Sequence, residues 1–250
     1  MANAKNIVIG GIAGGIGSAL ARRLHKNGHT VVGYGRDSEK LEALQSELEG
    51  VQTAVCDATD AEALDTRLKQ FADDLGSIDA YVHAVGSIYL KPAHQTPVEE
   101  FAKTIELNLY SAFYALRTVA GRMQKQGHGN CLFFSTAAAR AGIANHESIA
   151  AAKGGIEALV RSAASTYSSR HLRFNAIAPS LTDTAMSEPI TKNEKALEFS
   201  KLMHPLGDIA YPDDVASLAE WLLSDNARFV TGQVYVVDGG VSSIVPKPKV

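Results

Sequence analysis

The sequence predicts an α/β protein in which a single domain holds one doubly wound parallel sheet. Short apolar runs alternate along the chain with longer amphipathic stretches, the pattern expected when helices connect parallel strands. The runs at residues 7–9 and 132–134 are apolar throughout, as is typical of strands covered by helices on both faces. No proline- or serine-rich linker and no internal repeat divides the chain. We therefore expect about seven strands, with helices on both faces.

The expected elements follow in order along the chain. The strands share a β-rich, apolar character and are expected at residues 6–10, 30–35, 51–56, 78–84, 131–135, 173–178 and 233–237. The helices repeat apolar residues at helical spacing and are expected at residues 16–26, 38–48, 61–75, 98–123, 146–167 and 212–223. Residues 181–208 form a longer, more polar connection. We expect this insertion to be a substrate loop or lid, with a mobile surface excursion as the alternative.

Composition excludes several classes of protein. The 250 residues suffice to bury a core, and 24 basic against 27 acidic residues give a net charge of −3. This balance argues against a nucleic-acid binder or an anionic-membrane binder. Two cysteines, Cys56 and Cys131, form no disulfide framework and fit no zinc pattern, so no metal is expected. Without a signal peptide or a membrane-length apolar run, the sequence predicts a soluble cytoplasmic protein.

A glycine-rich loop follows the first expected strand and opens the first expected helix. Gly11 suits a tight turn, Gly15 allows backbone amides to approach a pyrophosphate, and Gly17 allows close packing of helix on strand. The helix N-terminus then faces the phosphates with free N–H groups and a favourable dipole. Ile12 and Ile16 lie in the same loop and are expected to line this site. The loop predicts a Rossmann fold that binds a nicotinamide dinucleotide.

The end of the second expected strand selects between NAD and NADP. An NAD site usually places a carboxylate there, to bind the ribose 2′-hydroxyl. In this chain Gly35 stands at that position and Arg36 follows, and a guanidinium suits a 2′-phosphate. If the count from the glycine loop is shifted by one residue, Asp37 would instead bind the ribose. NADP is the expected cofactor, with NAD as the alternative.

Several motifs in order along the chain resemble those of the short-chain dehydrogenase/reductase family, over nearly the whole length. They are the glycine loop, Cys56-Asp57, His83-Ala84-Val85-Gly86, Asn108-Leu109, residues 173–179 and residues 230–240. The resemblance implies an oxidoreductase that binds NAD(P) at the sheet. It also implies further cofactor contacts, at Asp57 and Ala58 for adenine, at His83, Ala84 and Gly86 in the next turn, and at Lys153, Pro179, Thr182 and Thr184 around the nicotinamide. A buried structural role is the alternative for His83.

The resemblance also implies a catalytic centre, from which this chain departs. The family uses a serine, a tyrosine and a lysine, with an asparagine for structure and proton relay. Alignment on Lys153 puts Thr136 at the serine position and Asn108 at the asparagine, but Ile149 at the tyrosine. An isoleucine cannot donate the proton that carbonyl reduction requires. A general acid contributes about 10²–10⁴-fold and positioning contributes more, so the loss need not abolish turnover.

Other groups in the sequence are candidates for supplying the proton. His146 lies three residues before Ile149, and imidazole titrates near neutral pH. Tyr89, and water relayed through Asn108 and Lys153, are the alternative proton sources. An exposed first helical turn is the alternative reading of His146.

Three functions remain open at this point. The first is an NADP-dependent oxidoreductase acting on a small carbonyl or alcohol. The second is a non-catalytic NADP(H)-binding protein, as a sensor or partner subunit, and the third is a lyase or isomerase. Apolar residues in the long connection indicate a partly apolar substrate: Met186, Ile190, Leu197, Phe199 and Met203. Small residues on the 146–167 helix suit close packing, either in a homodimer or homotetramer, as the resemblance implies, or on the sheet.

Overall fold

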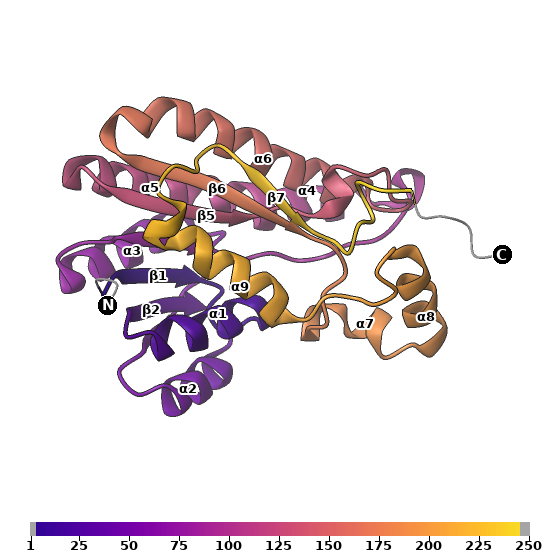
Figure 1. The fold of residues 1–250 in the computed structure, drawn as a ribbon, viewed down its shortest axis with the longest axis horizontal. Helices are drawn as coiled ribbons and strands as arrows, with labels where there is room; N and C mark the ends of the chain where they lie inside the picture. The colour runs from indigo at the N-terminus through magenta and orange to yellow at the C-terminus, as the bar shows by residue number, and fades with distance from the viewer. Residues whose placement is uncertain (1–3, 246–250) are drawn as a thin grey trace.

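The computed structural model describes residues 4–245, which form a seven-stranded parallel sheet between two layers of helices (Figure 1). The strand order is β3-β2-β1-β4-β5-β6-β7 and every neighbouring pair is parallel. The strands are β1 (Asn6–Gly10), β2 (Thr30–Gly35), β3 (Gln52–Val55), β4 (Ala80–His83), β5 (Gly129–Phe134), β6 (Leu172–Pro179) and β7 (Val234–Val237). The predicted fold class is confirmed.

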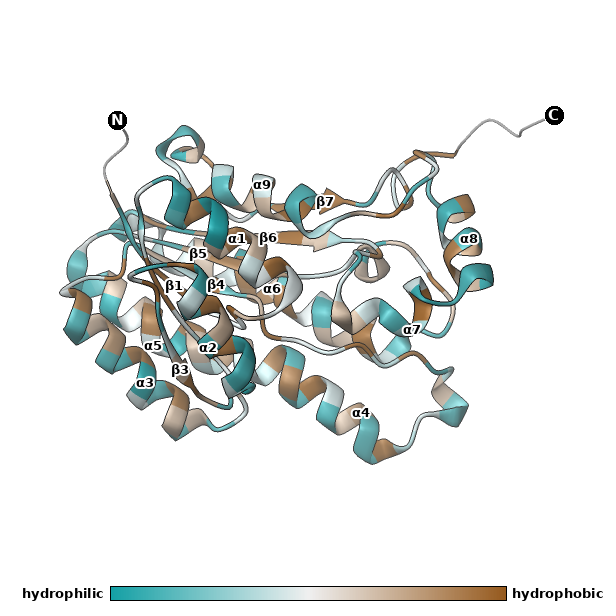
Figure 2. Ribbon diagram, turned by 90° about the horizontal axis from the view of Figure 1, so that it is seen from below, coloured by the Kyte–Doolittle hydropathy of each residue, from teal (hydrophilic) through white to brown (hydrophobic). Residues whose placement is uncertain are grey.

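Two separate apolar layers hold the helices against the sheet. Successive side chains of a strand point to opposite faces, so Val8 joins one layer while Ile7 and Ile9 join the other. The first layer receives α3 (Ala61–Leu75), α5 (Ser111–Gln126) and α6 (Glu147–Tyr167). The second receives α1 (Gly15–Lys26), α2 (Ser38–Glu47) and α9 (Pro212–Leu223). Figure 2 shows the hydrophobic residues gathered in the strands and along stripes of the helices.

The strand order reverses beside β1, which pairs with β2 on one side and with β4 on the other. Crossover connections leave in opposite directions at this point, so the loops at the carboxyl ends of β1 and β4 separate and leave a crevice. Gly10 ends β1 opposite Tyr34 of β2 and His83 of β4. The topology therefore places a ligand site beyond these three strand ends.

The predicted helix at 98–123 is interrupted. It consists of α4 (Val98–Ile105), a π-helical turn η2 (Glu106–Tyr110) and α5. The expectation of one continuous helix was wrong, because apolar periodicity does not register one additional residue inserted into a turn. Such π-turns are frequent at functional sites, and this one carries the fully buried Asn108.

The long connection between β6 and α9 contains helices of its own. After a short 3₁₀ turn at Ala185–Ser187 come α7 (Glu188–Thr191) and α8 (Glu194–Met203). The side chain of Asn193 caps α8 by accepting a hydrogen bond from the Ala196 N–H at 3.1 Å. Both helices lie beyond the carboxyl ends of the strands, at the right of Figure 1.

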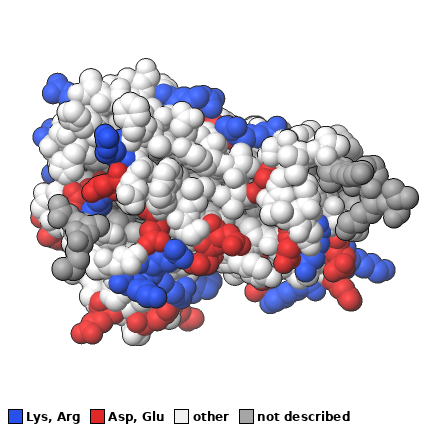
Figure 3. Space-filling model, in the orientation of Figure 1, with Lys and Arg blue, Asp and Glu red and all other residues white. Residues whose placement is uncertain are grey.

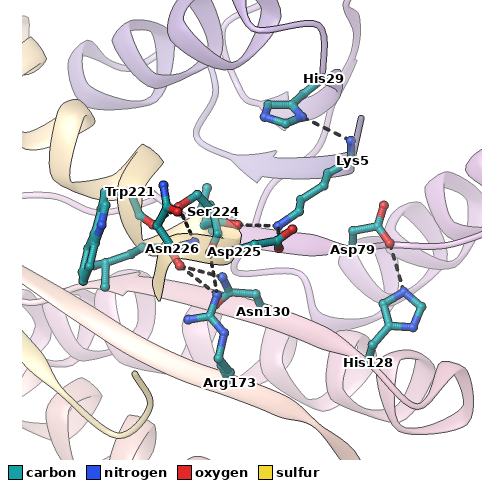
Figure 4. A network of polar contacts seen from close by, with 12 residues as sticks. Lys5, His29, Asp79, His128, Asn130, Arg173, Trp221, Ser224, Asp225 and Asn226 are labelled. Carbon is teal, nitrogen blue, oxygen red and sulfur yellow. Dashed lines mark hydrogen bonds and ion pairs between the residues drawn. The ribbon is translucent and has the colours of Figure 1, made fainter. Parts of the chain in front are cut away.

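A polar network lies at the amino-terminal ends of the strands, on the side of the sheet away from the crevice (Figure 4). Arg173 of β6 and Asn130 of β5 donate to the Leu222 carbonyl, at 2.9 and 2.8 Å, and Lys5 donates to the Leu223 carbonyl at 3.0 Å. These carbonyls end α9 and lack partners within the helix, and cations are favourable at a helix C-terminus. The network anchors α9 at the amino-terminal edge of the sheet, away from the crevice.

Charge is distributed without a single dominant sign on the face shown in Figure 3. Over α2 and α8, at the lower edge of that view, basic and acidic side chains lie interspersed. Within residues 4–245, no helix combines the length and the apolar character needed to cross a bilayer.

Candidate active site

A cavity of about 640 Å³ opens at the carboxyl ends of the strands. The loops after β1, β2, β4, β5 and β6, the first turns of α6 and the α7–α8 segment all contribute to its wall. Most of the predicted site residues line it: Gly11, Gly15, Ile16, Gly17, Arg36, Asp57, Ala58, Ala84, Gly86, Asn108, Thr136, His146, Lys153, Pro179, Thr182 and Thr184. The size is typical of a small-molecule or cofactor site.

The glycines of the first loop pack so closely against neighbouring atoms that none of them could carry a side chain. Gly11 has a φ of +75°, and a Cβ there would lie 2.7 Å from the Ala84 carbonyl oxygen. A Cβ on Gly15 would lie 2.5 Å from Thr184 Cγ2, and one on Gly17 would collide with the Gly11 carbonyl. The backbone at the start of α1 is therefore bare and faces the cavity, as a pyrophosphate site requires.

Arg36 and Lys40 both line the cavity at the end of β2. Asp37 is the N-cap of α2, and its side chain accepts a hydrogen bond from the Lys40 N–H at 3.1 Å. Lys40 Nζ lies 3.0 Å from the same carboxylate, and hydrogen bonds from Lys40 lower the pKa of Asp37. At Gly35, an added Cβ would meet nothing closer than 3.5 Å, so this position has room for a ligand group.

Asp57 follows β3 and is fixed by its own turn. Its Oδ1 accepts hydrogen bonds from the N–H and the hydroxyl of Thr59, at 2.9 and 2.8 Å. The backbone hydrogen bond from Thr59 is the main cause of a lowered pKa at Asp57, and the Arg36 guanidinium contributes. The carboxylate is thus held ionised beside the adenine end of the cavity expected from the sequence.

Asn108 ties the π-turn to the loop after β4. Its Oδ1 accepts from the Ser87 N–H at 3.1 Å, and its Nδ2 donates to the Ser87 hydroxyl and the Thr104 carbonyl at 3.1 and 2.9 Å. A Cβ on Gly86 would lie 2.9 Å from Asn108 Oδ1 and 3.2 Å from Lys153 Nζ. The loop, the asparagine and the lysine therefore meet at one point of the cavity wall.

Lys153 and Ile149 lie one helical turn apart on α6, and both line the cavity. Lys153 is 7% exposed, and burial lowers its pKa to about 8. Ile149 is 4% exposed, so its aliphatic side chain forms part of the wall beside the ammonium. Among the described residues, no hydroxyl extends from α6 at this position.

Two residues with hydroxyl side chains follow β5, and they have different surroundings. Ser135 is buried and donates to Glu157 Oε1 at 2.9 Å. Thr136 Oγ1 accepts from the Ala138 N–H at 3.3 Å, which leaves its O–H for a ligand. Thr136 is accordingly the hydroxyl of this pair that suits a substrate carbonyl.

His146 is the N-cap of α6, and its ring lines the cavity. Its Nδ1 lies 2.8 Å from the Ala144 carbonyl oxygen, so Nδ1 carries a proton. The opposite ring nitrogen, Nε2, remains for a ligand. Tyr89, the weaker candidate, does not line the cavity.

Two of the predicted cofactor contacts, Ile12 and His83, do not line the cavity. The Ile12 side chain is fully buried in the layer below α1, and the Ile12 N–H donates to the Tyr34 carbonyl at 3.2 Å. The His83 ring lies outside the cavity wall, with Nδ1 2.8 Å from the Tyr81 hydroxyl and Nε2 3.0 Å from the Ser111 hydroxyl. Burial, reinforced by Lys153, lowers the pKa of His83 to about 3. His83 is therefore a neutral, structural histidine, which the sequence left as the alternative.

Other lining residues were not identified from the sequence. Lys40 lines the cavity and lies three residues after Asp37. A basic residue so soon after Arg36 is the sequence signal that could have identified it. Ser180, which follows β6, and His204, which follows α8, also line the cavity. No local sequence pattern indicates that these two residues lie close together. Among the apolar residues expected at the substrate, Met186, Ile190 and Met203 line the cavity, whereas Phe199 is 65% exposed.

Comparison with known proteins identifies a family. A family model described as enoyl-(acyl carrier protein) reductase matches residues 11–242. D-Threitol dehydrogenase of Mycolicibacterium smegmatis is 29% identical over 240 residues, which cover 94% of this chain and 92% of that protein. Cis-4-hydroxycyclohexanecarboxylate dehydrogenase of Sinomonas cyclohexanicum is 32% identical over 242 residues, which cover 95% of this chain and 96% of that protein.

Solved structures agree with these relatives. A short-chain type dehydrogenase/reductase from Mycobacterium ulcerans superposes with a TM-score of 0.93 at 28% identity, covering 97% of this chain and 91% of that one. Levodione reductase superposes with a TM-score of 0.91 at 29% identity, covering 96% of this chain and 98% of that one. The chain is therefore an oxidoreductase that belongs to the short-chain dehydrogenase/reductase family.

Proposed function

We propose that this chain reduces a small carbonyl compound, or oxidises the corresponding alcohol, with NADP and a proton donor other than tyrosine. One observation carries the proposal. A single cavity unites the bare glycine backbone of α1 with Asn108, Thr136 and Lys153, while Ile149 lies one turn before the lysine. We infer that Ile149 stands where the family has its catalytic tyrosine.

The residues of the cavity fit a nicotinamide dinucleotide. Gly11, Gly15 and Gly17 line the cavity at the positive end of α1, where a Cβ on any of them would collide with neighbouring protein atoms. Asp57 would bind the adenine, and Lys153 would bind the ribose hydroxyls next to the nicotinamide. Thr184 packs over Gly15 and would border the carboxamide together with Thr182 and Pro179. When bound, the dinucleotide supplies the hydride.

A preference for NADP over NAD is supported at the end of β2. The Asp37 carboxylate is engaged by the N–H and the ammonium of Lys40, so it is a helix cap rather than a free acceptor for a ribose hydroxyl. Arg36 has no ion-pair partner within residues 4–245, and its guanidinium can grip a phosphate with two parallel hydrogen bonds. Arg36 and Lys40 both line the cavity beside Gly35.

Arg36→Ala is expected to weaken NADPH binding by roughly 10- to 100-fold, the loss of one charge-assisted bidentate contact. Affinity for NADH should stay unchanged, because NADH has no 2′-phosphate. Titration calorimetry with both dinucleotides measures this. Arg122→Ala, which removes a half-buried arginine paired with Asp73 away from the cavity, is the control. Equal losses for NADPH and NADH would contradict the assignment of NADP.

The carbonyl would bind between Thr136 and the α7–α8 segment. Thr136 can donate a hydrogen bond to the carbonyl oxygen, and Met186, Ile190 and Met203 provide an apolar wall. Residues 181–208 supply that wall, and we propose that they act as a substrate loop. A partly apolar substrate suits this environment.

Carbonyl reduction can be tested with NADPH and a panel of diketones and cyclic ketones. We expect slow but measurable NADPH oxidation, because hydride positioning is retained while the phenol is absent. Boiled enzyme gives the background rate. Failure of every carbonyl at high enzyme concentration, with NADPH bound, would overturn the oxidoreductase proposal for this chain.

The alternative of a non-catalytic NADP(H)-binding protein is not favoured, since the relatives above are named dehydrogenases. It would predict tight NADPH binding without turnover. Lyase or isomerase chemistry would instead give a product without net NADPH oxidation. No contact in the cavity favours either alternative.

We also propose a homodimer or a homotetramer. Ala151 on α6 is exposed, and nothing lies within 4 Å of a Cβ built on Gly154, so this surface can approach a second helix closely. Gly155 instead packs on Leu109 of the same chain. Light scattering after gel filtration distinguishes these states, and a monomer would contradict the proposal.

A further inference from the structure

A serine and a histidine from distant segments meet at the cavity wall. Ser180 directly follows β6, and His204 ends α8. His204 Nε2 lies 2.8 Å from Ser180 Oγ, and His204 Nδ1 lies 2.6 Å from the Ser200 carbonyl oxygen. Both residues line the cavity that holds Ile149 and Lys153. The Ser180 N–H donates to the Val237 carbonyl at 3.0 Å, which fixes the serine on the sheet.

These contacts determine the tautomer of His204. A carbonyl oxygen only accepts hydrogen bonds, so Nδ1 must carry a proton. Nε2 of the neutral ring is then an acceptor, and Ser180 donates its O–H to it. When the ring is protonated, Nε2 donates instead, and the Ser180 hydroxyl is released to donate to a ligand in the cavity. The protonation state of His204 thus sets the direction in which Ser180 donates.

We propose that Ser180 and His204 form the proton relay that replaces the missing phenol. This inference rests on the proposed carbonyl reduction. As the substrate carbon gains hydride, the C–O π bond breaks and the oxygen takes the Ser180 Oγ proton. Ser180 recovers a proton from His204 Nε2, and His204 takes one from water. Alcohol oxidation follows the same steps in reverse. Ser180 is the catalytic residue, and His204 is a positioning residue that acts through it.

His204 is held in a buried position. The residue is 6% exposed, and its ring lies under the turn that follows β7, where its Cδ2 would be 3.4 Å from a Cβ on Gly239. The carboxylates of Asp208 and Asp238 lie near the ring, and Lys201 of α8 pairs with Asp208 at 3.3 Å. Arg36, Lys40 and Lys153 are the lysine and arginine residues that line the same cavity.

The first test compares kcat and KM of His204→Gln and Ser180→Ala with the wild type, using NADPH and the diketone phenanthrenequinone. Glutamine can keep a hydrogen bond to Ser180 but transfers no proton. If the contact between Ser180 and His204 were only structural, kcat should therefore be unchanged in His204→Gln. We expect kcat to fall at least about tenfold in both variants, with the NADPH dissociation constant unchanged. His128→Gln is the control, since His128 pairs with Asp79 at the opposite edge of the sheet (Figure 4).

A rescue separates catalysis from structure. Adding Ile149→Tyr to His204→Gln should restore kcat, because a phenol bypasses the relay. A double variant as slow as His204→Gln alone would overturn the relay.

A measurement without substrate tests the geometry itself. Nitrogen-15 NMR of the histidine rings, without cofactor, should show the Nδ1–H tautomer at His204 and a shifted Nε2 resonance in Ser180→Ala. An Nε2–H tautomer would overturn the relay. Turnover retained in both single variants would overturn the relay alone, whereas NADPH binding with no turnover in the wild type would overturn the proposed function as well.

Discussion

Ile149→Tyr should raise kcat for carbonyl reduction by roughly 10²-fold, the lower end of what a positioned general acid contributes. Ile149 lines a cavity of about 640 Å³, so a phenol has space to extend from α6. It would lie one turn before Lys153, whose ammonium favours the ionised phenol and so lowers its pKa. The lower end is expected because a resident proton donor already contributes. Steady-state NADPH oxidation with a fixed diketone measures the gain.

Ile149→Phe is the matched control, since it adds the same ring without a hydroxyl. We expect no gain from it, and a loss if the ring obstructs the substrate. Equal rates for the tyrosine and phenylalanine variants would show that ring volume, and not proton donation, limits turnover. That result would remove the argument that Ile149 occupies the acid position.

Lys153→Met should raise the free energy of unfolding at pH 7, even though it removes a residue of the site. Burial lowers the pKa of Lys153 from 10.5 to about 8, so the folded protein holds a desolvated ammonium at neutral pH. The corresponding destabilisation is of the order of 3 kcal/mol, and methionine of similar volume removes it. Dinucleotide affinity should fall in the same variant. Urea unfolding without cofactor measures the stability.

The advantage of methionine should disappear as the pH rises. Below a pH of about 8 the lysine is charged in both the folded and the unfolded state, so the full destabilisation is present. Between about 8 and 10.5 the folded state loses its proton first, so wild-type stability at this group rises with pH. Above 10.5 both states are neutral. Lys26→Met, at an exposed lysine of α1, should show no such change, and a less stable Lys153→Met at pH 7 would contradict the argument.

Sequence reasoning succeeded where the information is local. The glycine loop directs its own turn, because Gly11 adopts a positive φ and Gly17 packs on Gly11 within the same loop. Arg36 directly follows β2, so locating the end of that strand in the sequence was enough to place Arg36 at the cavity. Lys153 and Ile149 share a helical face that their spacing already defines.

Sequence reasoning did not foresee side-chain directions or a helix interruption that depend on neighbouring elements. Ile12 lies inside the glycine loop, yet its side chain fills the core against Gly33 of β2. His83 ends β4 at the cavity edge, but Tyr81 and Ser111 occupy both ring nitrogens. The π-turn around Asn108 keeps the apolar pattern of a helix, so periodicity alone did not detect it.

The sequence alone determined the alternation of strands and helices, the dinucleotide cradle and the absence of a tyrosine before Lys153, because each of these is encoded within a few consecutive residues. Tertiary structure alone decided that Asp37 caps a helix, that His83 is sealed in the core and that Ser180 meets His204. Such contacts join residues from separate elements, and their geometry exists only once those elements have packed around a common core.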